Sequence, residues 1–304
     1  MFLRSGQQET LRTSLVIYAV GVTIYNVFFH PLANIPGPRL AAITRLWFFA
    51  TDISGDSSRR ILKWHQAHGP VIRVAPNELS ICGIDAYLSE IYAQNTKFTK
   101  APYFYEAFDN PHGTVFSQLD KAAHSGEKRL MSHAFSRRNI VGMQHELYGH
   151  VHKWVDRLRE LGLQQLPSPL VNDVTELEKV PLMEAVAKES LRYGCPIRGR
   201  NPRIVPEGGM VCGGAHIPQG TCVFSAQWYH CTNPSVYPQP ELFKPERWLV
   251  DDADALHAMN RHLVVFSNGS RNCIGQNLAV VCCWPRGTAA ASDLAGLMLK
   301  KKKV

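Results

Sequence analysis

Apolar positions are most concentrated near the start of the chain. No formally charged side chain occurs between Arg12 and Arg39, and Leu15 to Phe29 contains only two polar residues. A helix needs about 17–25 such residues to cross the hydrocarbon core of a bilayer, and the flanking uncharged residues extend this run to the lower limit. No small-residue cleavage site follows, which disfavours a signal peptide. The pattern predicts a membrane anchor over residues 1–30, with a buried helix as the alternative.

The segment 31–40 follows this apolar run and contains Ile35-Pro-Gly-Pro-Arg39. Two prolines around a glycine cannot continue a helix, because proline lacks a backbone N–H and its ring clashes with the preceding turn. We therefore expect a Pro-rich hinge between the anchor and a folded body.

Beyond residue 40, helical and extended periodicities succeed one another. Val71–Val74 and Glu78–Ile81 are short apolar runs joined by a proline-containing turn, which predicts a β-hairpin. Lys97–Gln118 is rich in aromatic residues, proline and glycine and is expected to be a long loop. The fold class is therefore mainly α with a small β-rich part (α+β). The remaining expected helices cover 59–68, 86–92 (capped by Asp85), 121–135, 139–161, 182–193 and 274–281, and further strands cover 203–205 and 221–224.

Composition and charge limit the classes of function that the chain can have. The 304 residues are 45% hydrophobic and 19% charged, as in ordinary globular proteins. The net charge is +8, but half of this excess lies in the tail 282–304. Because no basic stripe with interleaved aromatic residues appears elsewhere, we expect no nucleic-acid partner. None of the eight cysteines forms a C-x-x-C pair, which disfavours a zinc ribbon.

The strongest candidate site is the segment Phe-Ser-Asn-Gly-Ser-Arg-Asn-Cys-Ile-Gly, residues 266–275. Its cysteine, Cys273, lies in a glycine-punctuated loop just before the expected helix 274–281. Amide N–H groups and a helix N-terminus both stabilise a thiolate, and a thiolate is the form of cysteine that binds a metal. The segment therefore predicts a metal-bound sulfur.

Four neighbours of Cys273 suit a flat, anionic cofactor. Gly269 and Gly275 allow close approach of the backbone, Arg271 can pair with a carboxylate, and Phe266 can pack beside the sulfur and limit water access. Together with Cys273 they match F-x-x-G-x-R-x-C-x-G, and the chain resembles the cytochrome P450 (cytochrome P-450) heme-thiolate monooxygenases at every fixed position. The resemblance implies that Cys273 is the axial ligand of heme iron.

A second motif resembles the same family. Glu189-Ser-Leu-Arg192 matches E-x-x-R, which alone is weak because such pairs are common on helix surfaces. Phe243-Lys-Pro-Glu-Arg247-Trp248 is similar to the family's P-E-R-F/W segment. In the family these residues form a buried structural triad, so the resemblance implies a triad of Glu189, Arg192 and Arg247.

Two further heme contacts are implied by the resemblance. Arg203 falls where family members often hold a heme propionate. The family's W-x-x-x-R pair would fall on His124 and Lys128, both of which differ from the motif. Lys128 keeps a positive charge for a propionate, although as a flexible point charge and not a planar fork. Solvent exposure of Lys128 is the alternative.

Similarity to fungal microsomal members implies a membrane-anchored enzyme of the endoplasmic reticulum, with its globular part on the cytosolic side. Such an enzyme inserts one oxygen atom of O2 into a small apolar substrate, and secondary metabolism is the analogous setting. The cysteine thiolate pushes electron density toward the iron and favours O–O cleavage. An NADPH-cytochrome reductase is the implied electron donor.

The sequence departs from the family in the centre. No A-G-x-[DE]-T is present, so no catalytic acid or alcohol is assigned. We expect a heme-thiolate domain over 41–281 that lacks a central block near 161–170, followed by a divergent basic tail at 282–304. The alternative is a non-catalytic heme-binding or unfolded remnant. A metalloprotease is disfavoured, because His145 and His150 would lie about 140° apart on a helix and cannot share zinc.

Overall fold

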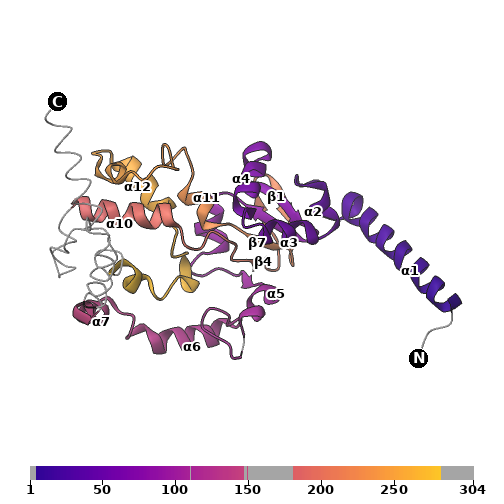
Figure 1. The fold of residues 1–304 in the computed structure, drawn as a ribbon, viewed down its shortest axis with the longest axis horizontal. Coiled ribbons are helices and arrows are strands. Elements are labelled where there is room, and N and C mark those ends of the chain that lie inside the picture. The colour runs from indigo at the N-terminus through magenta and orange to yellow at the C-terminus, as the bar shows by residue number, and fades with distance from the viewer. Residues whose placement is uncertain (1–4, 110, 147–148, 150–180, 282–304) are drawn as a thin grey trace, which may run out of the picture. The chain divides into compact units, whose positions relative to one another are not determined.

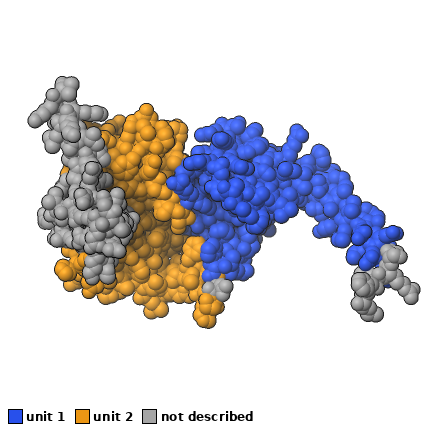
Figure 2. Space-filling model, viewed as in Figure 1, with its two compact units in different colours: residues 1–108, 198–229 blue, residues 109–197, 230–304 orange. Residues whose placement is uncertain are grey.

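The computed structural model describes residues 5–109, 111–146, 149 and 181–281 (Figure 1). The second half of the helix expected over 139–161, the block expected to be missing near 161–170 and the basic tail 282–304 lie outside these residues. The chain divides into two compact units, coloured separately in Figure 2. The first comprises Met1–Phe108 and Arg198–Tyr229, and the second comprises Asp109–Ile197 and His230–Val304.

The first unit contains a five-stranded sheet with the order β1-β2-β7-β4-β3. The predicted hairpin is confirmed, since β1 and β2 pair antiparallel with Val71 opposite Ile81. A parallel pairing of β2 with β7 brings residue 79 beside residue 223. A second hairpin, β5–β6, was not predicted. The strands are β1 (Val71–Ala75), β2 (Glu78–Ile81), β3 (Thr99–Lys100), β4 (Arg203–Ile204), β5 (Met210–Cys212), β6 (Ala215–Ile217) and β7 (Cys222–Phe224).

Several helices accompany the sheet in the first unit. The expectation of a loop over 97–118 is wrong for its first part, because residues 99–100 pair with β4 and Pro102 begins a helix. Asp85 precedes a helical segment as predicted, but its side chain makes no capping hydrogen bond. The helices are α1 (Ser5–Ile24), η1 (Tyr25–Phe29), α2 (Arg39–Ile43), α3 (Leu46–Ile53), α4 (Ser57–His68), η2 (Ala86–Ile91), α5 (Pro102–Tyr105) and η3 (Glu106–Phe108), with α11 (Gln227–Cys231) at the boundary between the units.

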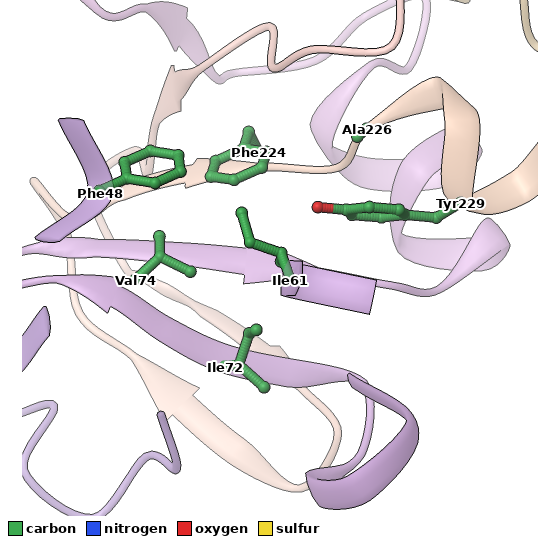
Figure 3. Packing of buried hydrophobic residues seen from close by; sticks show 7 residues of the cluster. All are labelled: Phe48, Ile61, Ile72, Val74, Phe224, Ala226 and Tyr229. Atoms are coloured by element: carbon green, nitrogen blue, oxygen red, sulfur yellow. The ribbon is translucent and has the colours of Figure 1, made fainter. Parts of the chain in front are cut away.

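Apolar side chains from α3, α4, β1 and β7 form the core of the first unit (Figure 3). The rings of Phe48 and Phe224 stack with centroids 5.9 Å apart, and Ile61, Ile72 and Val74 are at most 2% exposed. Burial of one such side chain contributes about 1.5–3 kcal/mol. This core fixes the sheet that carries Arg203.

The segment 31–40, predicted as a hinge, packs against β1. Leu32 is fully buried, and the Arg73 amide donates to the Pro36 carbonyl at 2.7 Å. The Arg73 guanidinium donates to the Asn26 carbonyl at 2.8 Å. A Cβ at Gly37 would lie 2.1 Å from the Arg73 carbonyl oxygen, so only glycine fits there. Within this unit the segment is therefore held by side-chain and backbone contacts.

The helix of residues Gln7–Phe29 has a mean hydropathy of 1.4 and, by length and composition, is able to cross a membrane. Only 6% of its apolar window is buried within the protein. This low burial favours the anchor over a core helix, which would be covered by other elements.

The second unit is helical. The helix predicted over 121–135 ends at Ser132, and Asp120 caps its start by accepting from the Ala123 amide at 2.7 Å. The helix predicted over 182–193 is confirmed as α10, whereas α12 was not predicted. The expected start at residue 274 is two residues early, because helical conformation runs from 276 to 281. The elements are α6 (Lys121–Ser132), α7 (Arg137–Gly142), α10 (Pro181–Gly194), η4 (Pro245–Leu249), α12 (Ala253–His262) and η5 (Gly269–Arg271).

Candidate functional site

The loop from Phe266 to Cys273 is closed by its own backbone. The Cys273 amide donates to the Phe266 carbonyl at 2.8 Å, and the Asn272 amide donates to the Gly269 carbonyl at 3.1 Å. Ser267 and Gly269 have φ values of +62° and +71°, and the former is unusual for a residue with a side chain. These turns leave the Cys273 side chain exposed at the surface of the loop.

Two cations connect this loop with α6 and the residues before it. Arg271 donates to the carbonyls of Gln118 and Leu119 at 2.8 and 2.9 Å. The Lys128 ammonium donates to the Ser270 carbonyl at 3.1 Å and to two oxygens of Asn272. Lys128 is half-buried, which excludes the alternative of full solvent exposure. Burial lowers the pKa of Lys128. Repulsion from Arg271 lowers this pKa as well, whereas Cys273 acts to raise it.

Gly275 and Phe266 have different surroundings. A Cβ added at Gly275 would lie 3.7 Å from the Cys273 sulfur, an ordinary contact distance. Phe266 lines a cavity of about 460 Å³ together with residues of α10 and of the helix 276–281. The packing of the Phe266 ring beside the sulfur stays a prediction.

Glu189 is the centre of a buried ionic cluster that we call the Glu189 cluster (Glu189, Arg192, Arg247 and Trp248). Arg192 donates to both carboxylate oxygens at 2.7 and 2.9 Å, and Arg247 donates at 3.2 Å. The Trp248 indole N–H and the Lys244 amide add bonds at 3.0 and 2.9 Å. Glu189 and Arg192 are fully buried. The structure thus brings together the three residues of the expected triad.

The remaining donors of the two arginines hold the surrounding chain. Arg192 donates to the carbonyls of Cys231 and Pro240 at 3.0 and 2.9 Å, and Arg247 donates to that of Pro238 at 2.8 Å. Burial raises the pKa of Glu189, but its hydrogen bonds, foremost those from Arg192, outweigh this and lower the pKa below its usual value. The cluster therefore stays charged and fixes the meander 231–248.

Both motifs lie within the residues that match a known family. The family model for cytochrome P450 matches residues 155–282. Among solved structures, a retinoic-acid-bound cyanobacterial CYP120A1 superposes with a TM-score of 0.62 at 16% identity, covering 85% of this chain and 91% of that chain. Over these residues the chain is similar to the cytochrome P450 family. The superposition shows a cytochrome P450-like fold.

Fungal cytochromes P450 are among the curated relatives. The cytochrome P450 monooxygenase aneF of Aspergillus aculeatus is 22% identical over 434 residues, covering 84% of this chain and 87% of the relative. That alignment is longer than the whole chain of 304 residues, so a large part of the relative has no counterpart here. A relative from Claviceps fusiformis named an inactive cytochrome P450 monooxygenase, cloA, is 41% identical over 107 residues. These cover 35% of this chain and 20% of the relative.

The residues of the second unit fit the heme of a cytochrome P450. Cys273 has an exposed thiol, and the backbone of its loop is already hydrogen-bonded. Heme binding would therefore require little further ordering of this loop. Sequence reasoning found this loop and the triad but missed Asn272 and the Trp248 indole as partners. The tryptophan beside Arg247 was a usable signal, because a buried indole N–H requires an acceptor.

Arg203 belongs to the first unit and is 4% exposed. Its guanidinium donates to the Tyr105 hydroxyl and to the Asn201 and Pro202 carbonyls, and it lies over the Tyr92 ring at 5.1 Å. All of these described partners are neutral. No anionic partner of Arg203 occurs among the described residues, and its expected contact with heme stays a prediction.

Proposed function

We propose that this chain is the heme-binding part of a monooxygenase that inserts one oxygen atom of O2 into a small apolar substrate, with heme held by Cys273. The observation that carries the proposal is the closed loop 266–273 with its accessible thiol. Bound heme would supply O2 activation, and the thiolate would favour O–O cleavage. Similarity to fungal cytochrome P450 monooxygenases supports, by analogy, a role in secondary metabolism.

The chain's own residues would have three tasks. The loop would orient the Cys273 thiolate, Arg271 would pair with a heme carboxylate, and Gly269 and Gly275 would leave room for the ring. Arg271 also holds backbone carbonyls at 118–119, so its pairing with heme would add to an existing structural role. The Glu189 cluster would keep the loop's surroundings fixed and take no part in the chemistry.

Membrane attachment and partners belong to the same proposal. The apolar helix 7–29 would anchor the protein in the endoplasmic reticulum membrane, with the folded part on the cytosolic side. Its position would give access to an NADPH-cytochrome reductase as electron donor and to apolar substrates dissolved in lipid. Family resemblance and the exposed apolar surface of this helix support this arrangement.

The carbon monoxide spectrum of the reduced protein tests the proposal. The full chain, expressed with heme supply, is expected to show the thiolate-type Soret band, and Cys273→Ser is expected to lose it. Cys212→Ser is the matched control, because Cys212 is a half-buried thiol in the β5–β6 hairpin of the other unit. A chain that retains no heme, or a Cys273→Ser variant with an unchanged band, would refute it.

A heme-binding remnant without catalysis is the second candidate. The observation that favours it is the alignment with aneF, which leaves a large part of that relative without a counterpart. Turnover of apolar substrates with NADPH and the reductase distinguishes the two: the remnant would show the thiolate band but consume no NADPH in response to substrate.

A further inference from the structure

Lys128 has no donor left for a cofactor. An ammonium group has three N–H donors. Those of Lys128 reach the Ser270 carbonyl at 3.1 Å, the Asn272 carbonyl at 3.0 Å and the Asn272 side-chain oxygen at 2.6 Å. All three oxygens lie within three residues of Cys273, on its N-terminal side. The geometry differs from that expected of a heme-propionate partner, whose donors would point away from the protein backbone.

The residue type suits these three contacts. A lysine ammonium is a compact charge with rotatable donors, whereas an arginine has a rigid planar fork. The three acceptors belong to two residues of one loop, Ser270 and Asn272, so a single ammonium group reaches all of them. Charge-assisted hydrogen bonds are about twice as strong as neutral ones, so one ammonium can hold the turn.

Arg271 completes the attachment from the opposite direction. Its guanidinium reaches from the loop to the carbonyls of residues 118 and 119, directly before Asp120, which caps α6. Lys128 reaches from α6 to the loop. The loop, residues 118–120 and α6 as far as Lys128 therefore form one hydrogen-bonded body within the second unit.

We propose that Lys128 is a positioning residue that fixes the backbone next to Cys273, and that it does not serve as a heme-carboxylate partner. This inference rests on the proposed function for its meaning, because positioning matters only if Cys273 binds heme. The contact itself exists without heme and is testable without heme.

The first experiment measures amide hydrogen exchange in the heme-free full chain. Lys128→Met is expected to speed exchange of the Asn272 and Cys273 amides at least tenfold, equivalent to about 1.4 kcal/mol. Arg129→Met is the matched control, because Arg129 is the next cation on α6 and is exposed. Unchanged exchange in α10 would show that the variant folds. A change of less than twofold at residues 272–273 would overturn the proposal.

Asn272→Ala gives an independent test that keeps the lysine. It removes one of the three acceptors, so a smaller acceleration of exchange is expected. The double variant with Lys128→Met should be less than additive, because both changes remove the same contact. Full additivity would contradict the assigned contact.

The second experiment uses the heme-loaded protein and Lys128→Arg, which restores the family's residue. If Lys128 positions the loop, arginine at this position will not replace its contacts. Lys128→Met and Lys128→Arg will then both lose the thiolate-type carbon monoxide band about tenfold faster than the parent. Equal or better heme retention by Lys128→Arg would overturn the proposal in favour of the carboxylate role. If the parent binds no heme but the exchange result holds, the proposed function fails and the positioning contact stands.

Discussion

Replacement of Glu189 by glutamine is the sharpest test of the buried cluster. The change keeps the shape of the side chain but removes the charge that faces Arg192 and Arg247, and it turns one acceptor into a donor. Arg192 would remain fully buried with a donor facing its own donors. Breaking one partner of a buried ion pair costs about 3–5 kcal/mol. With a urea slope of about 2–3 kcal/mol per molar, the unfolding midpoint should fall by about 1–2.5 M.

Pulsed hydrogen exchange during urea unfolding would follow this change in the second unit alone, through peptides that contain residues 189–192 and 244–248. Glu184→Gln is the matched control on the same helix, since its carboxylate is 55% exposed and pairs with Lys188 at 2.8 Å. Exposed pairs contribute about 0.2–1 kcal/mol, so the control midpoint should hardly move. If both variants unfold at the same urea concentration, the cluster does not stabilise the unit as described.

Acid unfolding of the same variant gives a second readout. The folded-state pKa of Glu189 lies below its ordinary value of 4.5, so its contribution is present above that pH and is lost as the pH falls through the folded pKa. Glu189→Gln cannot be protonated and should lose less stability between neutral pH and acid than the parent. An identical pH dependence would contradict the lowered pKa.

Three further predictions concern the first unit. Gly37→Ala should destabilise the first unit by about 1–3 kcal/mol, because the new Cβ would clash with the Arg73 carbonyl. Gly83→Ala is the control, since its Cβ would meet nothing within 4 Å, and thermal unfolding compares the two variants. Burial lowers the pKa of His65 to about 4, so stability present above pH 6.5 should fall as the pH drops toward 4, and His65→Gln should flatten this dependence in urea titrations. Deletion of residues 7–29 should move the protein from the membrane pellet to the supernatant on sedimentation, and a deletion variant that still pellets with vesicles would argue against the anchor.

Local patterns were enough to predict many of the elements. The hairpin 71–81, the helix ending at His68 and α10 each have apolar residues at a clear period and a proline or glycine at an end, so local chemistry agrees with the fold. The strand β3, which was not predicted, has two residues, and no periodicity exists in two residues. It forms only because the sheet supplies its partner, β4.

In the candidate site, too, some features were predictable from the sequence and others were not. Cys273 was indicated by its glycine-punctuated loop before a helix start, and the triad was implied by the resemblance of two motifs to those of a known family. The contacts of Lys128 did not follow, since its acceptors lie more than 140 residues away in the sequence and two of the three are backbone carbonyls. Every residue offers a carbonyl, so no residue type signals such an acceptor.

The Glu189 cluster also has a consequence for how this sequence can vary. Residues 231, 238 and 240 contribute only carbonyl oxygens to Arg192 and Arg247, whereas residues 189, 192 and 247 contribute side chains. The side chains along much of the meander can therefore be substituted while the path of its backbone stays the same. Substitutions within the meander 231–248 should therefore cost little stability, whereas substitutions of residues 189, 192 and 247 should cost much. A short motif can thus be retained while most of the sequence around it changes.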